Sequence, residues 1–268
     1  MGSTERSVER NMARREDGSA GDADYGTIGN NYARYRQAEP RIAAQILDAL
    51  GPAETVLNVG AGAGSYEPTE RQVTAVEPSA TMRAQRPASL PRAIDGTAEA
   101  LLFPDRSFDA SMATFSVHQW SDLRAGLAEM RRVTRGPVVI LSCDPMALDR
   151  YWLHRYAPEV TAVEARRYPP IESIREGLGG SVEVRTVAIP LACRDGFNEA
   201  YYGRPEMLLE EGARLACSGW SFVPPDAVAR FVATLDADLA SGAWDRDYGH
   251  LRQRAEFEGP LRLVIGRP

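Results

Sequence analysis

Short apolar runs alternate with longer amphipathic stretches between residues 41 and 142. In the stretches Arg41–Leu50 and Asp122–Arg135, apolar residues recur at the spacing of one helical face. Strands that alternate with such helices indicate a parallel sheet with right-handed crossovers. The apolar runs predict strands at Thr55–Val59, Val73–Val76, Ala93–Asp95, Ser107–Ala113 and Pro137–Ser142.

The second half of the chain adds a helix, two strands and a long insert. Ile171–Leu178 has helical spacing, Val182–Ile189 alternates apolar and polar residues like an edge strand, and Leu261–Ile265 is a last apolar run. Residues 190–260 between these strands are rich in aromatic side chains, and we expect them to form a helical lid over the carboxyl edge of the sheet. The aromatic residues could equally be the small core of a helical pair. One amphipathic helix of the insert should carry Val228, Phe231, Val232 and Leu235.

The first predicted strand runs directly into three glycines, Gly60, Gly62 and Gly64, which are separated by single alanines. Glycines at this spacing give the backbone unusual dihedral angles and let it approach a ligand without an intervening side chain. Glu77 stands at the carboxyl end of the next strand, where a carboxylate can accept hydrogen bonds from both hydroxyls of a ribose. The turn and the carboxylate together predict a nucleoside-binding site.

The spacing of the glycines narrows the choice of nucleotide. A dinucleotide fingerprint reads G-x-G-x-x-G, but Ser65 stands where its third glycine would be. A P-loop needs G-K-[ST], whereas no lysine or arginine occurs between Thr55 and Glu70. We therefore expect a ligand without phosphate groups at this turn.

Four segments in order carry a family resemblance: VLNVGAGAGSY, TAVEPSATM, GTAEALLFPDRSFD and LAEMRRVTRGPVVILS. Through them residues 25–142 resemble the class I S-adenosylmethionine-dependent methyltransferases of the ubiquinone and menaquinone biosynthesis type. The resemblance implies an α/β fold with a Rossmann-like, mostly parallel sheet of seven strands, in the order 3-2-1-4-5-7-6 with the last strand antiparallel. It also implies S-adenosylmethionine as the cofactor and S-adenosylhomocysteine as the product. Asn58 replaces the family's usual acidic residue by an amide, which accepts hydrogen bonds but carries no charge.

The family motifs also imply which residues bind the cofactor. Met82 could lie against the adenine ring, although a methionine there is as often plain core. Thr97 replaces the usual aspartate by a hydroxyl that still forms hydrogen bonds. Tyr32 and Arg36 should come from an amino-terminal helix that closes over the cofactor, or this helix simply packs its tyrosines and exposes its arginine. The implied set is Gly60, Ala61, Gly62, Gly64, Glu77, Pro78, Met82, Thr97, Ala98, Glu99, Phe115, Tyr32 and Arg36.

The segment from Phe115 to Trp120 should face the transferable methyl group, because ligands of open α/β sheets lie outside the carboxyl ends of the strands. His118 is a candidate general base, or it packs against the methionine moiety or caps a helix. The implied reaction is in-line displacement, in which an O, N or activated C atom of a small aromatic or hydrophobic metabolite attacks the methyl group. The candidate substrate-binding residues are Tyr25, His118, Trp120, Tyr201, Tyr202, Arg204 and Trp220.

Composition and charge restrict the kinds of partner that we expect the protein to bind. The net charge of -6 argues against nucleic acid, which needs a clustered Lys/Arg surface, and favours a small-molecule acceptor. The sequence shows neither a long apolar run nor a signal peptide, so we expect a cytoplasmic protein with no membrane partner. Cys143, Cys193 and Cys217 are widely spaced, which predicts reduced thiols and no metal. A homodimer is the protein partner that we consider.

The expected domain organisation follows these segments. The first residues are polar and too poor in apolar side chains to order themselves. The expected parts are a disordered tail (1–24), amino-terminal cap helices (25–50), the cofactor-binding core (51–189), the helical lid (190–260) and the last core strand (261–268).

Two other functions remain compatible with these motifs. A nicotinamide-dependent oxidoreductase would share the strand, the turn and the acid, but the missing third glycine and the last two matched motifs disfavour it. A non-catalytic protein that binds S-adenosylmethionine for a regulatory purpose would carry every motif named.

Overall fold

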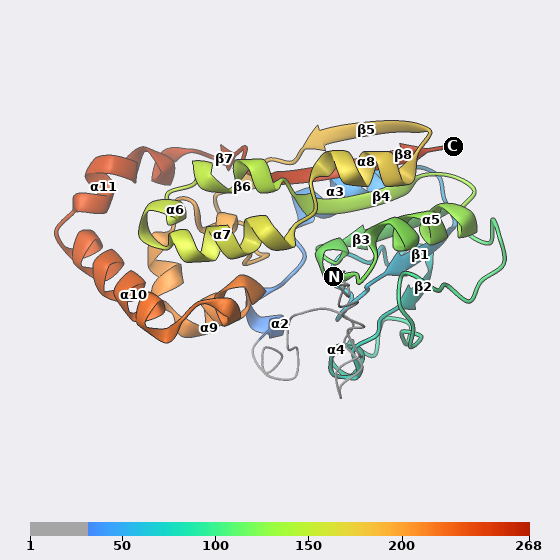
Figure 1. The fold of residues 1–268 in the computed structure, drawn as a ribbon, viewed down its shortest axis with the longest axis horizontal. Helices are drawn as coiled ribbons and strands as arrows, with labels where there is room; N and C mark the ends of the chain where they lie inside the picture. Colours follow the sequence, from blue (N-terminus) through green and yellow to red (C-terminus); the bar gives the residue numbers. More distant parts are fainter. Residues whose placement is uncertain (1–31) are drawn as a thin grey trace, which may run out of the picture.

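The computed structural model describes residues 32–268, with side chains from residue 34 onward. The predicted tail (1–24) and Tyr25 lie outside the described residues. Figure 1 shows the sheet with its flanking helices at one end of the molecule and a group of helices at the other. We call this second group the cap; it comprises residues 145–170 and 190–260, two segments that are separated in the sequence by a helix and a strand of the sheet layer.

The sheet has six strands in the order β2-β1-β3-β4-β8-β5. The first four strands along this order run parallel, and β8 is antiparallel to both of its neighbours, β4 and β5. These six strands follow the predicted order without its strand 3, and the last strand is antiparallel as predicted. The strands are β1 (Thr55–Val59), β2 (Gln72–Val76), β3 (Ala110–Thr114), β4 (Val138–Cys143), β5 (Ser181–Thr186) and β8 (Leu261–Arg267), while β6 (Ile189–Pro190) and β7 (Glu256–Phe257) pair outside the sheet.

The strand predicted at Ala93–Asp95 is present only as a single bridge, so the expected count of seven strands is wrong by one. Ile94 pairs with Val76 in the parallel direction, on the side of β2 away from β1. Pro91 and Gly96 bound this segment, and because proline lacks a backbone donor and glycine weakens a strand, the pairing cannot extend.

Helices cover both faces of the sheet and build the cap (Figure 1). The sheet layer contains α3 (Pro40–Leu50), α4 (Ala80–Ala84), α5 (Leu123–Val133) and α8 (Ile171–Leu178), preceded by α2 (Tyr32–Tyr35). The cap contains α6 (Leu153–Tyr156), α7 (Pro158–Arg167), α9 (Glu211–Leu215), α10 (Pro225–Ala240) and α11 (Ala243–Tyr248). Short 3-10 helices are η2 (Val117–Gln119), η3 (Pro145–Arg150), η4 (Asn198–Tyr201), η5 (Pro205–Leu209), η6 (Ser218–Phe222) and η7 (Gly249–Gln253).

Alternate residues of the central strands face two different hydrophobic clusters. Ile140 of β4 belongs to the cluster under α5 and α8, whereas Val139 and Leu141 belong to the cluster under α3. This alternation is what a strand buried on both faces requires, and it places helices on both sides of a mostly parallel sheet.

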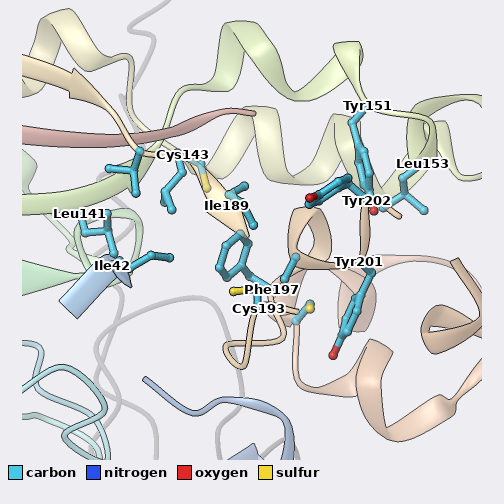
Figure 2. Close-up of a cluster of buried hydrophobic side chains, with 14 of the residues drawn as sticks. Ile42, Leu141, Cys143, Tyr151, Leu153, Ile189, Cys193, Phe197, Tyr201 and Tyr202 are labelled. Carbon is cyan, nitrogen blue, oxygen red and sulfur yellow. The ribbon is translucent and has the colours of Figure 1, made fainter. Parts of the chain in front are cut away.

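The cluster under α3 continues without interruption into the cap. Figure 2 shows Ile42 of α3 and Leu141 of β4 at one end of this cluster and Tyr151, Tyr201 and Tyr202 of the cap at the other. The Trp152 indole donates a hydrogen bond to the Tyr202 carbonyl at 3.0 Å, which joins the two sequence segments of the cap. Cap and sheet therefore share one core, and the cap is held firmly at the carboxyl edge of the strands.

Two observations bear on the expected partners. Within residues 32–268 no helix is long and apolar enough to cross a membrane. In the same part of the chain, no group of three or more His, Cys, Asp or Glu side chains is arranged to hold a metal ion. All three cysteines are buried and free, as predicted.

Candidate active site

The glycine turn follows β1 and requires glycine at its first position. Gly60 has φ of 68°, and its N–H donates to the Val76 carbonyl at 2.9 Å. A Cβ atom at Gly60 would lie 2.5 Å from the Cβ of Ser116, closer than two carbon atoms can approach. The turn therefore presses against the segment after β3 and leaves an uncovered backbone facing the crevice above the strands.

Glu77 is fixed at the end of β2 by two backbone donors. Its Oε2 atom accepts a hydrogen bond from the Gly62 N–H at 2.7 Å, and its Oε1 atom accepts one from the Ser79 N–H at 2.9 Å. Burial raises the pKa of Glu77, and these two N–H groups oppose that shift. The carboxylate thus joins the glycine turn to the start of α4, and its remaining lone pairs can accept hydrogen bonds from a ligand.

An open crevice of about 890 Å³ lies between the glycine turn, the end of β2 and the segment after β3. The predicted cofactor-binding residues gather here, apart from Gly64 and Tyr32. Gly64 does not line the crevice, and the side chain of Tyr32 lies outside the described residues. The predicted residues that line it are Arg36, Gly60, Ala61, Gly62, Glu77, Pro78, Met82, Thr97, Ala98, Glu99 and Phe115, together with Trp120, which the sequence predicts as a substrate-binding residue.

Several residues of this crevice were not predicted. Ser116 and Gln119 follow β3 beside Phe115, so their position in that segment was the available signal. Tyr66 ends the first family motif, VLNVGAGAGSY, which was the available signal, whereas Asp195 comes from the cap and no local pattern marks it as part of the site. The unpredicted residues of the crevice are Ala63, Ser65, Tyr66, Thr114, Ser116, Gln119 and Asp195.

Arg36, Asp195 and Tyr66 form a buried network that joins three distant segments. The guanidinium of Arg36 forms an ion pair with the Asp195 carboxylate at 2.5 Å, and the Tyr66 hydroxyl donates to the same carboxylate at 2.9 Å. The backbone of Gly196 also donates to the Tyr35 carbonyl at 2.7 Å. Since burial and the Asp195 charge both raise the pKa of Tyr66, its hydroxyl keeps its proton and stays a donor.

Substitution of Tyr66 by phenylalanine should lower the free energy of unfolding by about 1.5 kcal/mol, because it removes a buried hydrogen bond to a charged group. Tyr35→Phe is the matched control, since it removes a tyrosine–carboxylate hydrogen bond to Glu210 at an exposed position. That control should change stability by less than about 0.5 kcal/mol. Urea denaturation measures both, and equal effects of the two changes would contradict the role given to the network.

A second buried network stabilises the glycine turn. The Asn58 amide donates to Glu67 at 2.9 Å, and Arg86 forms an ion pair with the other oxygen of Glu67 at 2.6 Å. Glu67 thus supplies the negative charge that Asn58 lacks. The Oδ1 atom of Asn58 is buried and has no hydrogen-bond partner among the described residues. Asn58 does not line the crevice, so its part in the site is to position Glu67 beneath the turn.

Phe115 also lines a second cavity, which we call the inner chamber and whose space of about 550 Å³ includes solvent at its opening. Its φ of 51° is rare for a residue with a bulky side chain, and such strain is typical of functional sites. Arg36 and Phe115 line both cavities, and the ring centroid of Phe115 lies 5.3 Å from that of Phe197. The inner chamber is lined by Arg36, Phe115, His118, Cys143, Leu148, Glu164, Tyr168, Phe197, Asn198, Glu199, Ala216, Cys217 and Ser218.

His118 lines the inner chamber and not the crevice. Its ring centroid lies 4.4 Å from that of Tyr168, which places the imidazole at the wall between the segment after β3 and the end of α7. This position is compatible with both predicted roles of His118, as a general base or as a packing residue.

The four lid residues predicted to bind substrate lie in the core of the cap. Tyr202 donates to the Arg254 carbonyl at 2.7 Å, Arg204 donates to the Cys193 carbonyl at 2.9 Å, and Trp220 donates to the Asn198 side chain at 2.9 Å. Of the residues that the structure describes, the linings of the two cavities include none of Tyr201, Tyr202, Arg204 and Trp220. Their contacts give them a structural role.

Comparison with known proteins agrees with this geometry. Residues 57–140 match the family described as "Methyltransferase domain". A solved structure from Anabaena variabilis, described as a methyltransferase from an antibiotic biosynthesis pathway, is 30% identical, with a TM-score of 0.81, over 87% of this chain and 99% of that one. The uncharacterized methyltransferase YcgJ of Bacillus subtilis is 32% identical over 91 residues, which are 30% of this chain and 36% of that protein.

A more distant structure shows the same fold with a ligand. The phosphoethanolamine N-methyltransferase 2 of Haemonchus contortus, solved with S-adenosylhomocysteine, has a TM-score of 0.50 and 16% identity over 91% of this chain and 55% of that one. The motifs, the fold and the Anabaena relative agree, and S-adenosylmethionine is the cofactor that the family uses. The chain belongs to the class I S-adenosylmethionine-dependent methyltransferase family.

Proposed function

We infer that the protein transfers the methyl group of S-adenosylmethionine to a small aromatic or hydrophobic metabolite of the natural-product type, by in-line displacement. The observation that carries this proposal is the shared wall between the two cavities: Phe115 and Arg36 line both the crevice and the inner chamber. A cofactor-binding crevice with an adjoining, mostly buried chamber suits a small acceptor. The Anabaena relative, described as a protein of antibiotic biosynthesis, supports the same class of substrate.

The residues of the crevice fit S-adenosylmethionine. Glu77, held by Gly62 and Ser79, would accept hydrogen bonds from the ribose hydroxyls. Gly60 lines the crevice without a side chain, which leaves room for the methionine moiety. When bound, the cofactor supplies a methyl group on a positively charged sulfur, which is already a good leaving group.

The protein's contribution is positioning and exclusion of water. The Arg36–Asp195–Tyr66 network holds the cap and the amino-terminal segment against the glycine turn. Phe115 borders both the donor and the acceptor site, and its ring packs against Phe197 of the cap. Fixing two reactants in a dry site removes much of the entropic and solvation cost of their reaction.

Two measurements test this proposal. Isothermal titration should show binding of S-adenosylhomocysteine and no binding of NAD(H). A nicotinamide-dependent oxidoreductase would instead bind NAD(H) and not S-adenosylhomocysteine. Transfer of a labelled methyl group from S-adenosylmethionine to a mixture of metabolites should yield a labelled small molecule. Cofactor binding without any labelled product would support the regulatory alternative instead. The domain boundaries, the cytoplasmic location and a homodimer stay predictions from the sequence.

A further inference from the structure

The inner chamber contains one carboxylate that forms no ion pair with a side chain of the described residues. Glu199, in the first turn of η4, lines the chamber and is only 5% exposed. No side chain of the described residues donates a hydrogen bond to its carboxylate, whose donor is its own backbone N–H. The other carboxylate that lines the chamber, Glu164, has a cation, because it lies 3.9 Å from the Arg167 guanidinium. A buried carboxylate without a cation is costly unless a ligand supplies one.

Among the described residues, the one side chain of the lining with a fixed positive charge, Arg36, is paired with Asp195, and the aromatic part of the lining is suited to a cation. Rings of Phe115, Tyr168 and Phe197 surround the space, and the faces of aromatic rings attract cations. Burial raises the pKa values of the Cys143 and Cys217 thiols and of the Tyr168 hydroxyl, so these three groups stay neutral.

We propose that the inner chamber binds the methyl acceptor as a cationic amine and that Glu199 pairs with its ammonium group and takes a proton from it. This inference rests on the proposed function, because the amine is the acceptor of the methyl group. It deepens that function by naming the nucleophilic atom as nitrogen and the base as Glu199, where the sequence pointed to His118.

The proton and the electrons of the proposed step balance. One N–H bond of the ammonium breaks, its proton moves to a carboxylate oxygen of Glu199, and the bonding pair stays on nitrogen as a lone pair. Nitrogen then forms a bond to the methyl carbon while the carbon–sulfur bond breaks and its pair stays on sulfur. The products are the N-methylated ammonium and S-adenosylhomocysteine, and Glu199 later releases its proton to water.

The ionisation of Glu199 supports this assignment. Burial, together with the nearby charge of Glu164, raises its pKa to about 7, so it can exchange a proton near neutral pH. Its own N–H and the charge of Arg36 oppose the shift. The titratable and charged groups that line the chamber with it are Arg36, His118, Cys143, Glu164, Tyr168 and Cys217.

The experiment measures binding and does not depend on turnover. Benzylamine, 2-phenylethylamine and tryptamine are titrated into the protein saturated with S-adenosylhomocysteine, beside alcohols and carboxylates of the same skeletons. At about pH 8, at least one amine should bind about tenfold more tightly than its alcohol, and the carboxylates should bind more weakly still. This preference should fade as the pH falls below about 7, because Glu199 then becomes neutral.

Variants assign the preference to Glu199. Glu199→Gln should abolish it and leave the affinity for S-adenosylhomocysteine unchanged, since Glu199 does not line the crevice. Glu199→Asp should retain part of it, whereas Glu176→Gln, an exposed charge change on α8, should retain all of it. The circular dichroism spectrum and S-adenosylhomocysteine binding show whether each variant is folded.

Two results would overturn the proposal: no preference for any amine in the unmodified protein, or a preference that survives in Glu199→Gln. Failure of the proposed function looks different, because S-adenosylhomocysteine would then not bind at all. S-adenosylhomocysteine could bind, and a labelled methyl group could reach a phenol or a carbon atom, while no amine is preferred. In that case the proposed methyltransferase function stands and only the assignment of a cationic amine to the chamber fails.

Discussion

Replacement of Glu77 by alanine should weaken the binding of S-adenosylhomocysteine by about 100-fold, measured as Kd by isothermal titration. The Glu77 carboxylate is oriented by the Gly62 and Ser79 N–H groups before any ligand arrives. Its loss removes two charge-assisted hydrogen bonds to the ribose at once. Because burial raises the pKa of Glu77, the charged side chain contributes little to folding, and the variant should stay folded.

A pair of ligands locates this effect at the ribose. In the unmodified protein adenosine should bind about tenfold more tightly than 2′-deoxyadenosine, because one of the two hydrogen bonds to Glu77 is missing in the deoxy compound. In Glu77→Ala the two nucleosides should bind equally. Glu176→Ala, which removes an exposed carboxyl on α8, is the control and should preserve the difference. A tenfold difference that persists in Glu77→Ala would place the ribose elsewhere.

The local parts of this site were predictable from the sequence, because each depends on residues that are close together in the chain. The apolar run Thr55–Val59 and the glycines that follow it specify a buried strand and a tight turn within one segment. Glu77 comes directly after the next strand, and β1 and β2 pair in parallel with their ends aligned. Local sequence is enough in such a case, since the carboxyl ends of neighbouring parallel strands meet at one edge.

The parts that were missed depend on contacts between distant segments. Asp195 is separated from Arg36 by 159 positions and from Tyr66 by 129, and no periodicity relates such residues. The cap likewise combines residues 145–170 with 190–260, although an apolar pattern alone cannot say which aromatic segments share a core. The sequence drew attention to Tyr201, Tyr202 and Trp220 because they are large and aromatic, yet such residues most often serve the core. The less conspicuous Glu199 faces the chamber instead.

The burial of Glu199 also predicts how stability depends on pH. An acid whose pKa is higher in the folded than in the unfolded state binds more protons when folded, so its contribution to stability is lost as the pH rises. For Glu199 the pKa rises from an ordinary value of 4.5 to about 7. The loss should therefore begin near pH 4.5 and be complete above about pH 7, where it amounts to about 3 kcal/mol.

Comparison of Glu199→Gln with the unmodified protein isolates this contribution. Glutamine has nearly the same shape and cannot ionise, so the difference in the free energy of unfolding should shift in favour of the variant by about 3 kcal/mol between pH 4.5 and 8. Glu176→Gln removes the same charge from an exposed position, and its difference should not follow that curve. Addition of an amine that fills the inner chamber should restore stability at high pH to the unmodified protein only, since the ligand then supplies the missing cation. A pH-independent difference for Glu199→Gln would mean that this carboxyl already has a partner in the free protein, and with it the reason to expect a cationic acceptor would disappear.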